Sequence, residues 1–356
     1  MSVYPGFSTD RMDAIFALSS RVAAMAEVEA AVAGAQGAAG DIPADAATAI
    51  VAACADTIDA DILAQGWAVG TPVIPLLEIL RSRLPESWRA FLHHGLTTQD
   101  IVDTAAMCLS SSALHHLGDL SSDTAAALRT IIKHAGSVAT EARSFLQPAD
   151  VTTFAFRAAR WLDQLDRARG RVDTIERPVQ LGGLIGDRMS IPDDVVDGVA
   201  ERLGLDSRPP WHTDRAPVIG IVNAITDLAR WAAKVGVDIA QLVQLGEITT
   251  RAGGSSAAVG KRNPIDAMRA TAAAEVCLGI ATVVLHAKPH ELERGLGSWH
   301  AEWFALPLIF QTAGAAMEAV CAALGSLEVQ PSALVVADDR RIAADAYVTS
   351  VLEQSP

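Results

Sequence analysis

The stretch 218–243 constrains the fold of this chain more than any other. Its apolar side chains recur at helical spacing but occupy nearly every face of the helix. A helix that is apolar all round must be buried on all sides. In a chain of 356 residues such burial usually requires neighbouring subunits as well as the chain's own helices. The apolar positions are Val218, Ile219, Ile221, Val222, Ile225, Leu228, Trp231, Ala232, Val235, Ile239, Leu242 and Val243.

The rest of the chain also shows helical spacing, and we find neither strand-like alternation nor sequence repeats. Half of the residues are hydrophobic (50%) but only 5% are aromatic, which favours closely packed helices over sheets. We therefore predict an all-α fold built on a long-helix bundle. We expect a small N-terminal helical domain over 1–100, a central bundle and oligomer core over 101–325, and a short helical tail over 326–356. The expected helices cover 9–39, 44–65, 73–83, 98–139, 152–175, 218–243, 264–287 and 304–324.

Charge and cysteine content restrict the functional classes. A net charge of −14 argues against a nucleic-acid surface, so an anionic substrate would need a locally basic pocket. The four cysteines (Cys54, Cys108, Cys277 and Cys321) lie far apart, which indicates reduced thiols and no metal site. We see no signal peptide and no apolar run of membrane-spanning length that is free of charge. We expect a cytoplasmic protein without nucleic-acid or membrane partners.

A glycine- and serine-rich loop covers 253–264 and precedes an apolar helix. Lys261 and Arg262 bring positive charge to it, and we interpret Asn263-Pro264 as an N-cap followed by proline at the first helical position. Such a loop suits the binding of carboxylate or phosphate at a helix N-terminus. From the loop alone, an ordinary connector between two helices remains open.

Three further stretches carry polar groups. In 93–100, Thr97 and Asp100 have capping-box spacing, which places two histidines and two hydroxyls at a helix start; an ordinary cap beside surface histidines is the alternative. The stretch 142–149 resembles a proline-marked turn between helices. The stretch 290–303 is dense in ionisable and indole groups. It is either one wall of a site or a polar connector, and both interpretations remain open. Glycine-rich 178–190 lacks the preceding strand and the following GKS/T of a phosphate loop, which excludes a nucleotide fold.

Taken together, these stretches resemble the aspartase/fumarase superfamily. The loop 253–264 resembles its signature, GSS followed by Met-Pro and Lys-x-Asn-Pro, and 93–104 (HHGLTTQDIVDT) resembles its H-x-G-x-T-S-x-D-x-x-D-T region. The resemblance runs from about residue 8 to 310 and is greatest to the 3-carboxy-cis,cis-muconate cycloisomerases. The segments that carry this are Met12–Phe16, Gly70–Leu76, Leu146–Ala149 with Thr152–Phe154, Trp211–Thr213, and His290–Arg294 with Trp299–Trp303.

The resemblance implies chemistry at a carbon next to a carboxylate, through a carbanion stabilised as an aci-carboxylate. Ser255 would be the proton donor, Lys261 and Asn263 would stabilise charge, and His94 would assist. No metal or organic cofactor is implied. The substrate would be a small polycarboxylate, and the assembly a homotetramer with each site built from three subunits. The substrate-binding residues would be His93, Thr97, Thr98, Gln99, Arg143, Gln147, Arg215, Ser256, Arg262 and His290.

The activity implied is closure of 3-carboxy-cis,cis-muconate to 4-carboxymuconolactone, a step of protocatechuate degradation in the β-ketoadipate pathway. The chain departs from the signature at Ala258-Val259, where the superfamily has Met-Pro, which should make the loop more flexible. Ser144-Phe145 replaces a usual Thr-His, which argues against adenylosuccinate or argininosuccinate lyase activity. We expect a reduced C-terminal domain. Two alternatives stay open: a lyase acting on another substituted succinate to give fumarate or an analogue, and a catalytically silent helical oligomer.

Overall fold

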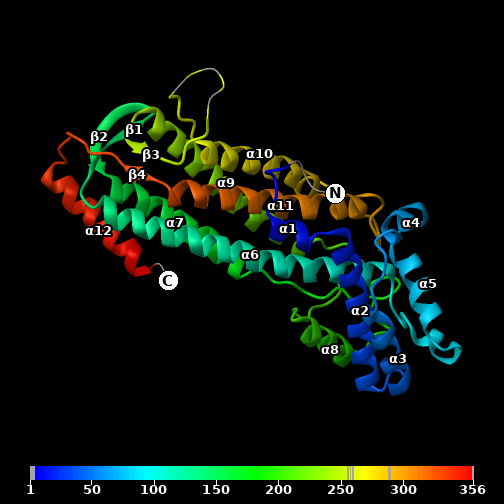
Figure 1. Cartoon of the computed structure of the whole chain (residues 1–356). Helices are drawn as coiled ribbons and strands as arrows, with labels where there is room; N and C mark the ends of the chain where they lie inside the picture. The colour runs from blue at the N-terminus through cyan, green and yellow to red at the C-terminus, as the bar shows by residue number, and fades with distance from the viewer. Residues whose placement is uncertain (1–4, 255, 257, 259, 288–289, 355–356) are drawn as a thin grey trace.

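In the part of the chain that the structure describes, five long helices lie side by side and form the body of the molecule (Figure 1). The structure is a computed structural model, and it describes residues 5–254, 256, 258, 260–287 and 290–354. The long helices are α6 (Thr98–Ala135), α7 (Phe154–Asp173), α9 (Ala216–Gln244), α10 (Ile265–Leu285) and α11 (Ser298–Gly325). Helix α10 packs against α9 and α11, and α6 packs against α7 and α11. The predicted all-α bundle is confirmed.

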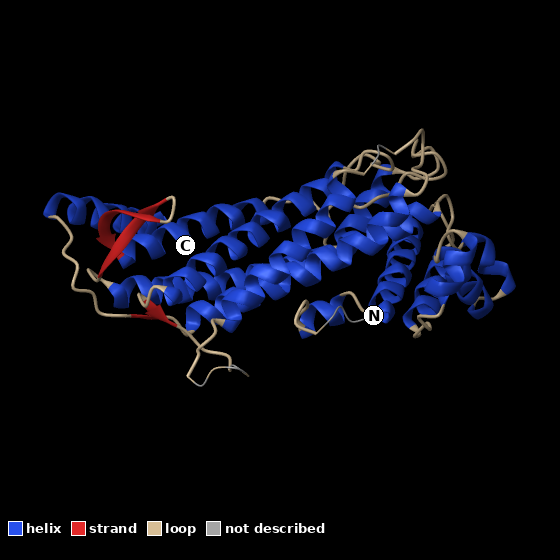
Figure 2. Cartoon of the chain, turned by 90° about the horizontal axis from the view of Figure 1, so that it is seen from above, coloured by secondary structure: helices blue, strands red, loops and turns tan. Residues whose placement is uncertain are grey.

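The remaining elements gather at the two ends of this bundle (Figures 1 and 2). Near the start of α6 lie α1 (Asp10–Ile15), α2 (Leu18–Ala39), α3 (Ala44–Ala55), α4 (Ile62–Val69), α5 (Val73–Arg83), the 3₁₀ turn η1 (Glu86–Phe91) and α8 (Asp193–Leu203). Near its end lie β1 (Ala139–Ser144), β2 (Gln147–Thr153), β3 (Ile248–Thr249), β4 (Glu328–Val329) and α12 (Asp338–Gln354).

Several helix boundaries follow from local sequence. Thr97 caps α6, and its N–H donates to Asp100 Oδ2 at 2.9 Å, so the predicted capping box is confirmed. The helix predicted over 9–39 instead breaks between α1 and α2, and the one predicted over 44–65 breaks between α3 and α4. Helix α11 begins at Ser298 rather than near 304, so the indole-rich segment is helical. Helix α8 has no counterpart among the helices expected from the sequence.

The prediction of a turn between helices over 142–149 is wrong. Strands β1 and β2 pair antiparallel from Ala139↔Thr153 to Ser144↔Gln147, and a second small pair joins β3 to β4. The two-residue hairpin turn is Phe145-Leu146, with φ of 49° and 62°. Turns of this kind usually carry Asn-Gly or another glycine pair, so no hairpin signal is visible in the sequence here. Bulky residues in this conformation are strained, and both side chains are exposed.

The described residues form two hydrophobic cores. The larger core belongs to the long helices. The smaller one contains α2 to α5 together with Val179, Leu181, Ile191 and the buried side of α8. The N-terminal unit is therefore completed by 179–200, because α8 packs against α2. Helix α12 packs against α7, with Tyr347 Oη donating to Asp163 Oδ2 at 3.0 Å.

The apolar helices α9 and α10 are only partly covered within one chain. Ile219 and Val237 of α9, and Met268, Val276 and Val283 of α10, are exposed. By length and composition, α10 and α11 could each cross a membrane; 67% of the α11 window is buried in the bundle, against 33% for α10. These two helices are closer to a membrane span in composition than the sequence analysis allowed. Core helices of soluble proteins meet the same criterion, so length and apolar composition are weak evidence for a membrane span.

Three cysteines are expected to be unreactive in the folded chain. Burial raises the pKa of Cys54, Cys108 and Cys277 to about 12, from an ordinary value of 9.0. A thiol-specific disulfide reagent should therefore label them slowly at neutral pH and rapidly after denaturation. Between pH 9 and 12 the unfolded chain releases protons that the folded chain retains, so these thiols lower the stability of the fold as pH rises. Rapid labelling of Cys277 in the native protein would contradict this.

Candidate active site

The first turn of α6 is fixed by a buried carboxylate. Asp100 is fully buried, and its two oxygens accept hydrogen bonds from Thr97 N–H at 2.9 Å, Gly182 N–H at 2.8 Å and Gly183 N–H at 3.0 Å. His212 Nε2 lies 3.0 Å from Asp100 Oδ1. The glycine-rich stretch 178–190 therefore wraps a carboxylate of the protein itself. Gly186 is required beside it, because a Cβ there would lie 2.9 Å from His212 Nδ1 at a φ of 81°.

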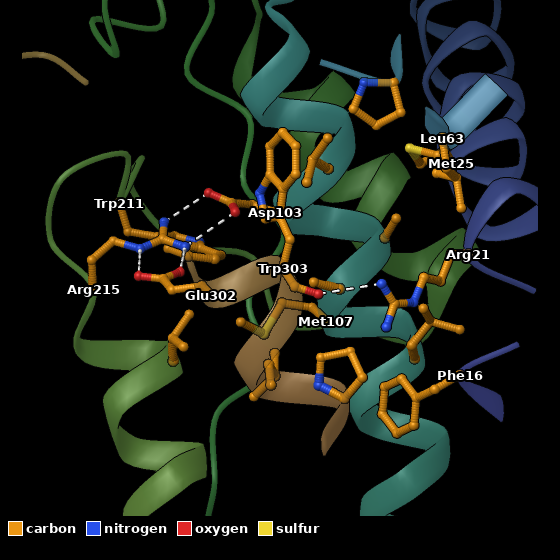
Figure 3. A pocket seen from close by; sticks show the side chains of 18 residues that line it. Phe16, Arg21, Met25, Leu63, Asp103, Met107, Trp211, Arg215, Glu302 and Trp303 are labelled. Carbon is orange, nitrogen blue, oxygen red and sulfur yellow. Dashed lines mark hydrogen bonds and ion pairs between the residues drawn. The ribbon is translucent and has the colours of Figure 1, made fainter. Parts of the chain in front are cut away.

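A second buried network lies one turn further along α6 (Figure 3). Arg215 donates Nη1 to Asp103 Oδ2 at 2.7 Å and Nη2 to Glu302 Oε2 at 2.5 Å, so it lies between two carboxylates. Burial by itself would lower the pKa of Arg215, but the two carboxylates raise it above the ordinary value. Trp299 Nε1 donates to Asp103 Oδ1 at 2.9 Å, and His290 Nε2 lies 3.3 Å from Glu302 Oε1. The network joins the starts of α6, α9 and α11.

The outer rim of this end is formed by residues before and at the helix start. His93, at a φ of 62°, places Nδ1 2.6 Å from Oε1 of the buried Glu29. Arg294 Nη2 donates to Thr97 Oγ1 at 2.6 Å. His94 is exposed, and Thr98 is half-buried at the first helical position. The positive end of the α6 dipole and the cation of Arg294 thus favour an anion here.

The other predicted site residues lie at the opposite end of the bundle. Arg143 of β1 is held by Glu141 and Glu247, with Nη2 2.7 Å and 2.6 Å from their oxygens. Burial would raise the pKa of Glu247, but hydrogen bonds and charge from Thr140, Arg143 and Arg157 hold it below its ordinary value. Gln147 is exposed directly after the hairpin turn.

The signature loop leaves this same end and is closed at its base. Gly253 N–H donates to Asn263 O at 2.9 Å, and Asn263 Nδ2 donates to Gly254 O at 3.0 Å. The prediction that Asn263 is the N-cap of α10 is wrong, because the N-cap is Pro264. The side-chain amide of Asn263 instead joins the two ends of the loop through Gly254 O. Ser256, Lys261 and Arg262 are exposed. Ser255 lies outside the described residues.

One chain does not bring these groups together. The N-cap of helix α9 is Arg215, whose side chain is paired with Asp103. The C-terminal end of α9 leads into β3 and then into the signature loop. Its 29 residues span roughly 43 Å at the α-helical rise. The rim at Thr97 and the loop at Lys261 are therefore separated by about the length of a long helix. Across the described part of the chain, no three His, Cys, Asp or Glu side chains are grouped to hold a metal ion.

Comparison with known proteins places the chain in a family. A family profile described as lyase matches residues 6–279, which is most of the sequence. The chain belongs to this lyase family. The resemblance on which the sequence analysis relied is thereby confirmed at the level of the family.

Individual relatives of the lyase carry different names. A 3-carboxy-cis,cis-muconate cycloisomerase of Acinetobacter baylyi is 33% identical over 88% of this chain and 74% of its own length. A nitrosuccinate lyase of Streptomyces davaonensis is 32% identical over 86% of this chain and 70% of its own. The solved structure of a 3-carboxy-cis,cis-muconate lactonizing enzyme from Pseudomonas putida superimposes with a TM-score of 0.84 at 30% identity, covering 91% of this chain and 76% of that one.

Three residues predicted to bind substrate occupy buried positions in the lyase. Gln99 is fully buried and donates Nε2 to Asp103 Oδ2 at 3.0 Å and to His212 O at 2.8 Å. Arg215 and His290 belong to the network around Glu302, and their side chains are 6% and 2% exposed. The Gln99 amide nitrogen and the Arg215 guanidinium are bound by protein partners. Among the described residues, Gln99 Oε1 and both ring nitrogens of His290 have no hydrogen-bond partner.

Sequence reasoning missed the partners of these buried groups. Asp103, Glu302, His212 and Arg294 lay inside the quoted motifs but were not singled out, and Glu29 was not recognised at all. The signal in the sequence was that Glu29, Asp103 and Glu302 are charged positions in otherwise apolar helices, with several tryptophans near Glu302. Buried charges of this kind need partners, and that requirement could have suggested the pairs.

Proposed function

We propose that the lyase closes 3-carboxy-cis,cis-muconate to 4-carboxymuconolactone. The observation that carries the proposal is the 33% identity to a cycloisomerase over 88% of the chain. The fold supports it, because Thr97 and Thr98 stand at the positive end of α6, and two exposed cations, Lys261 and Arg262, lie on the signature loop. A polycarboxylate needs such local positive charge in a chain of net charge −14.

The proposed reaction is an intramolecular addition. One carboxylate oxygen of the muconate forms a C–O bond to a carbon of its own double bond, and the electron pair of that bond moves to the neighbouring carbon. Ser255 donates a proton to that carbon and regains one from solvent, so the lactone has the composition of the substrate anion plus one proton. Lys261, Asn263 and the α6 N-terminus stabilise the negative charge that develops on the way. His94 and His93 form part of the second wall.

The active unit that we propose is a homotetramer in which each site takes residues from three subunits. The separation of about 43 Å along α9 supports this, since neither group of residues has the other within reach in one chain. The exposed apolar faces of α9 and α10 and the exposed hairpin tip at Phe145-Leu146 supply surfaces for such contacts. We propose a cytoplasmic location, with no membrane or nucleic-acid partner and no metal or cofactor.

The proposal is tested by offering the purified protein 3-carboxy-cis,cis-muconate and following the loss of the diene absorbance in the ultraviolet. Turnover with formation of the lactone is expected. Nitrosuccinate and other substituted succinates are assayed beside it through the appearance of the conjugated product, because the S. davaonensis relative is almost equally similar. Turnover of a succinate in the absence of muconate turnover would replace the proposed reaction with an elimination.

A shared site predicts complementation between two inactive variants. Thr98→Ala removes a hydroxyl at one end of the bundle, and Lys261→Ala removes a cation at the other. If residues 98 and 261 of one site come from different subunits, a random mixture of equal amounts of the two variants should contain about a quarter of sites with both Thr98 and Lys261. The measurement is turnover after co-refolding, with each variant refolded alone as the control. Activity that never exceeds that of the separate variants would mean that one chain supplies both residues.

A further inference from the structure

A mainly apolar cavity lies between the N-terminal helices and the bundle, on the inner side of the buried network (Figure 3). Its volume is about 110 Å³, and its walls come from α1 and α2, α4, α6, α9 and α11. Apolar cavities of comparable size in other proteins hold small aromatic molecules. The side chains that shape the apolar part are Phe16, Met25, Leu63, Met107, Leu306 and Pro307.

Two hydrogen-bond donors on the wall of this cavity lack acceptors. Arg21 donates Nη1 to the backbone oxygen of Trp303 at 3.2 Å. Among the described residues, neither Arg21 Nε nor Trp303 Nε1 has a partner, although both atoms are buried. Buried polar groups of native proteins are nearly always satisfied, so an unpaired donor on a cavity wall indicates an acceptor that binds in the cavity.

The charge of Arg21 is also uncompensated. The carboxylates that line the cavity, Asp103 and Glu302, are already bound by Arg215. Burial lowers the pKa of Arg21, as expected for a cation removed from water. Arg21 further lies in the first turn of α2, where no acidic residue offsets the positive end of the helix dipole. The combination favours an anion at this point.

We propose that this cavity is a binding site for a small monocarboxylate with an apolar or aromatic body. The carboxylate accepts a hydrogen bond from the Arg21 guanidinium, while the body fills the space between Met25, Met107 and Leu306. Trp303 Nε1 is a second donor on the wall of the same cavity. The apolar walls and the single uncompensated cation exclude the tricarboxylate of the proposed reaction. The site is therefore distinct from the rim at Thr97, and it does not depend on the proposed function.

Benzoate is the probe for the test, in titration calorimetry with the full-length protein at neutral pH. Saturable binding of about one benzoate per chain is expected, and benzamide, which has the same body without the charge, should bind more weakly. Arg21→Met should weaken benzoate binding at least about tenfold, because a charge-assisted hydrogen bond is lost. Trp303→Phe removes the second donor but keeps the aromatic ring, so a smaller loss is expected.

Two controls separate this site from others. Arg230→Met removes an exposed arginine of α9, far from the cavity, and should leave benzoate binding unchanged. Lys261→Ala tests whether benzoate occupies the proposed catalytic site instead. The proposal is overturned if wild type shows no saturable binding at millimolar benzoate, if Arg21→Met and Trp303→Phe both bind as wild type does, or if Lys261→Ala alone abolishes binding. Circular dichroism establishes whether each variant is folded. If Arg21→Met does not fold, benzoate binding by Trp303→Phe tests the proposal in its place.

Discussion

Replacement of Ser255 with alanine is expected to lower the turnover of 3-carboxy-cis,cis-muconate about 10³-fold, within the range known for loss of a general acid. An ordinary serine hydroxyl is a poor acid or base, so its role depends on loop N–H groups and cations that stabilise the alkoxide. Lys261 and Arg262, both exposed on the same loop, are the cations at hand. The measurement is kcat from the diene absorbance at saturating substrate.

The matched control for this variant is Ser256→Ala on the next residue of the loop. It removes the same hydroxyl one position along the backbone, and we expect it to affect mainly KM, in keeping with a binding role. A kcat for Ser255→Ala equal to that of wild type would assign the proton transfer to another group. Equal losses in both variants would indicate that loop conformation, rather than one hydroxyl, is being measured.

Replacement of Arg215 with methionine is expected to destabilise the fold by about 3–5 kcal/mol, the usual cost of breaking a buried ion pair from one side. The variant leaves Asp103 and Glu302 facing each other without a cation, and both are almost fully buried. The variant also removes the ion pairs that connect the N-terminal ends of α6, α9 and α11. Chemical denaturation at one fixed protein concentration measures the loss, since assembly also contributes to stability.

Arg230→Met is the control for Arg215→Met. Arg230 lies on the same helix and pairs with Asp227 at 3.3 Å, but its side chain is 59% exposed. An exposed pair of this kind contributes about 0–1 kcal/mol. Similar losses in the two variants would show that the buried network is not what holds these helix ends together.

Local sequence was sufficient for much of the fold. The capping box at Thr97, the helix Val73–Arg83 and the apolar helices from Ala216 and Ile265 follow from contacts between residues a few positions apart. The break near Phe16, the helix α8 and the hairpin at Phe145-Leu146 did not follow, since each depends on packing against distant segments or on a turn without its usual residues.

By itself, the sequence determined the all-α class, the family and the order of the motifs, because periodicity and short motifs are local properties. Only the tertiary structure decided which motif residues face outward. Gln99, Arg215 and His290 are buried because partners far away in sequence, such as Glu302 at 87 positions from Arg215, lie next to them in space. The tertiary structure also placed Thr97 and Lys261 at opposite ends of a long helix and paired Arg21 with Trp303 on a cavity wall, since burial and distance arise from the packing of whole helices.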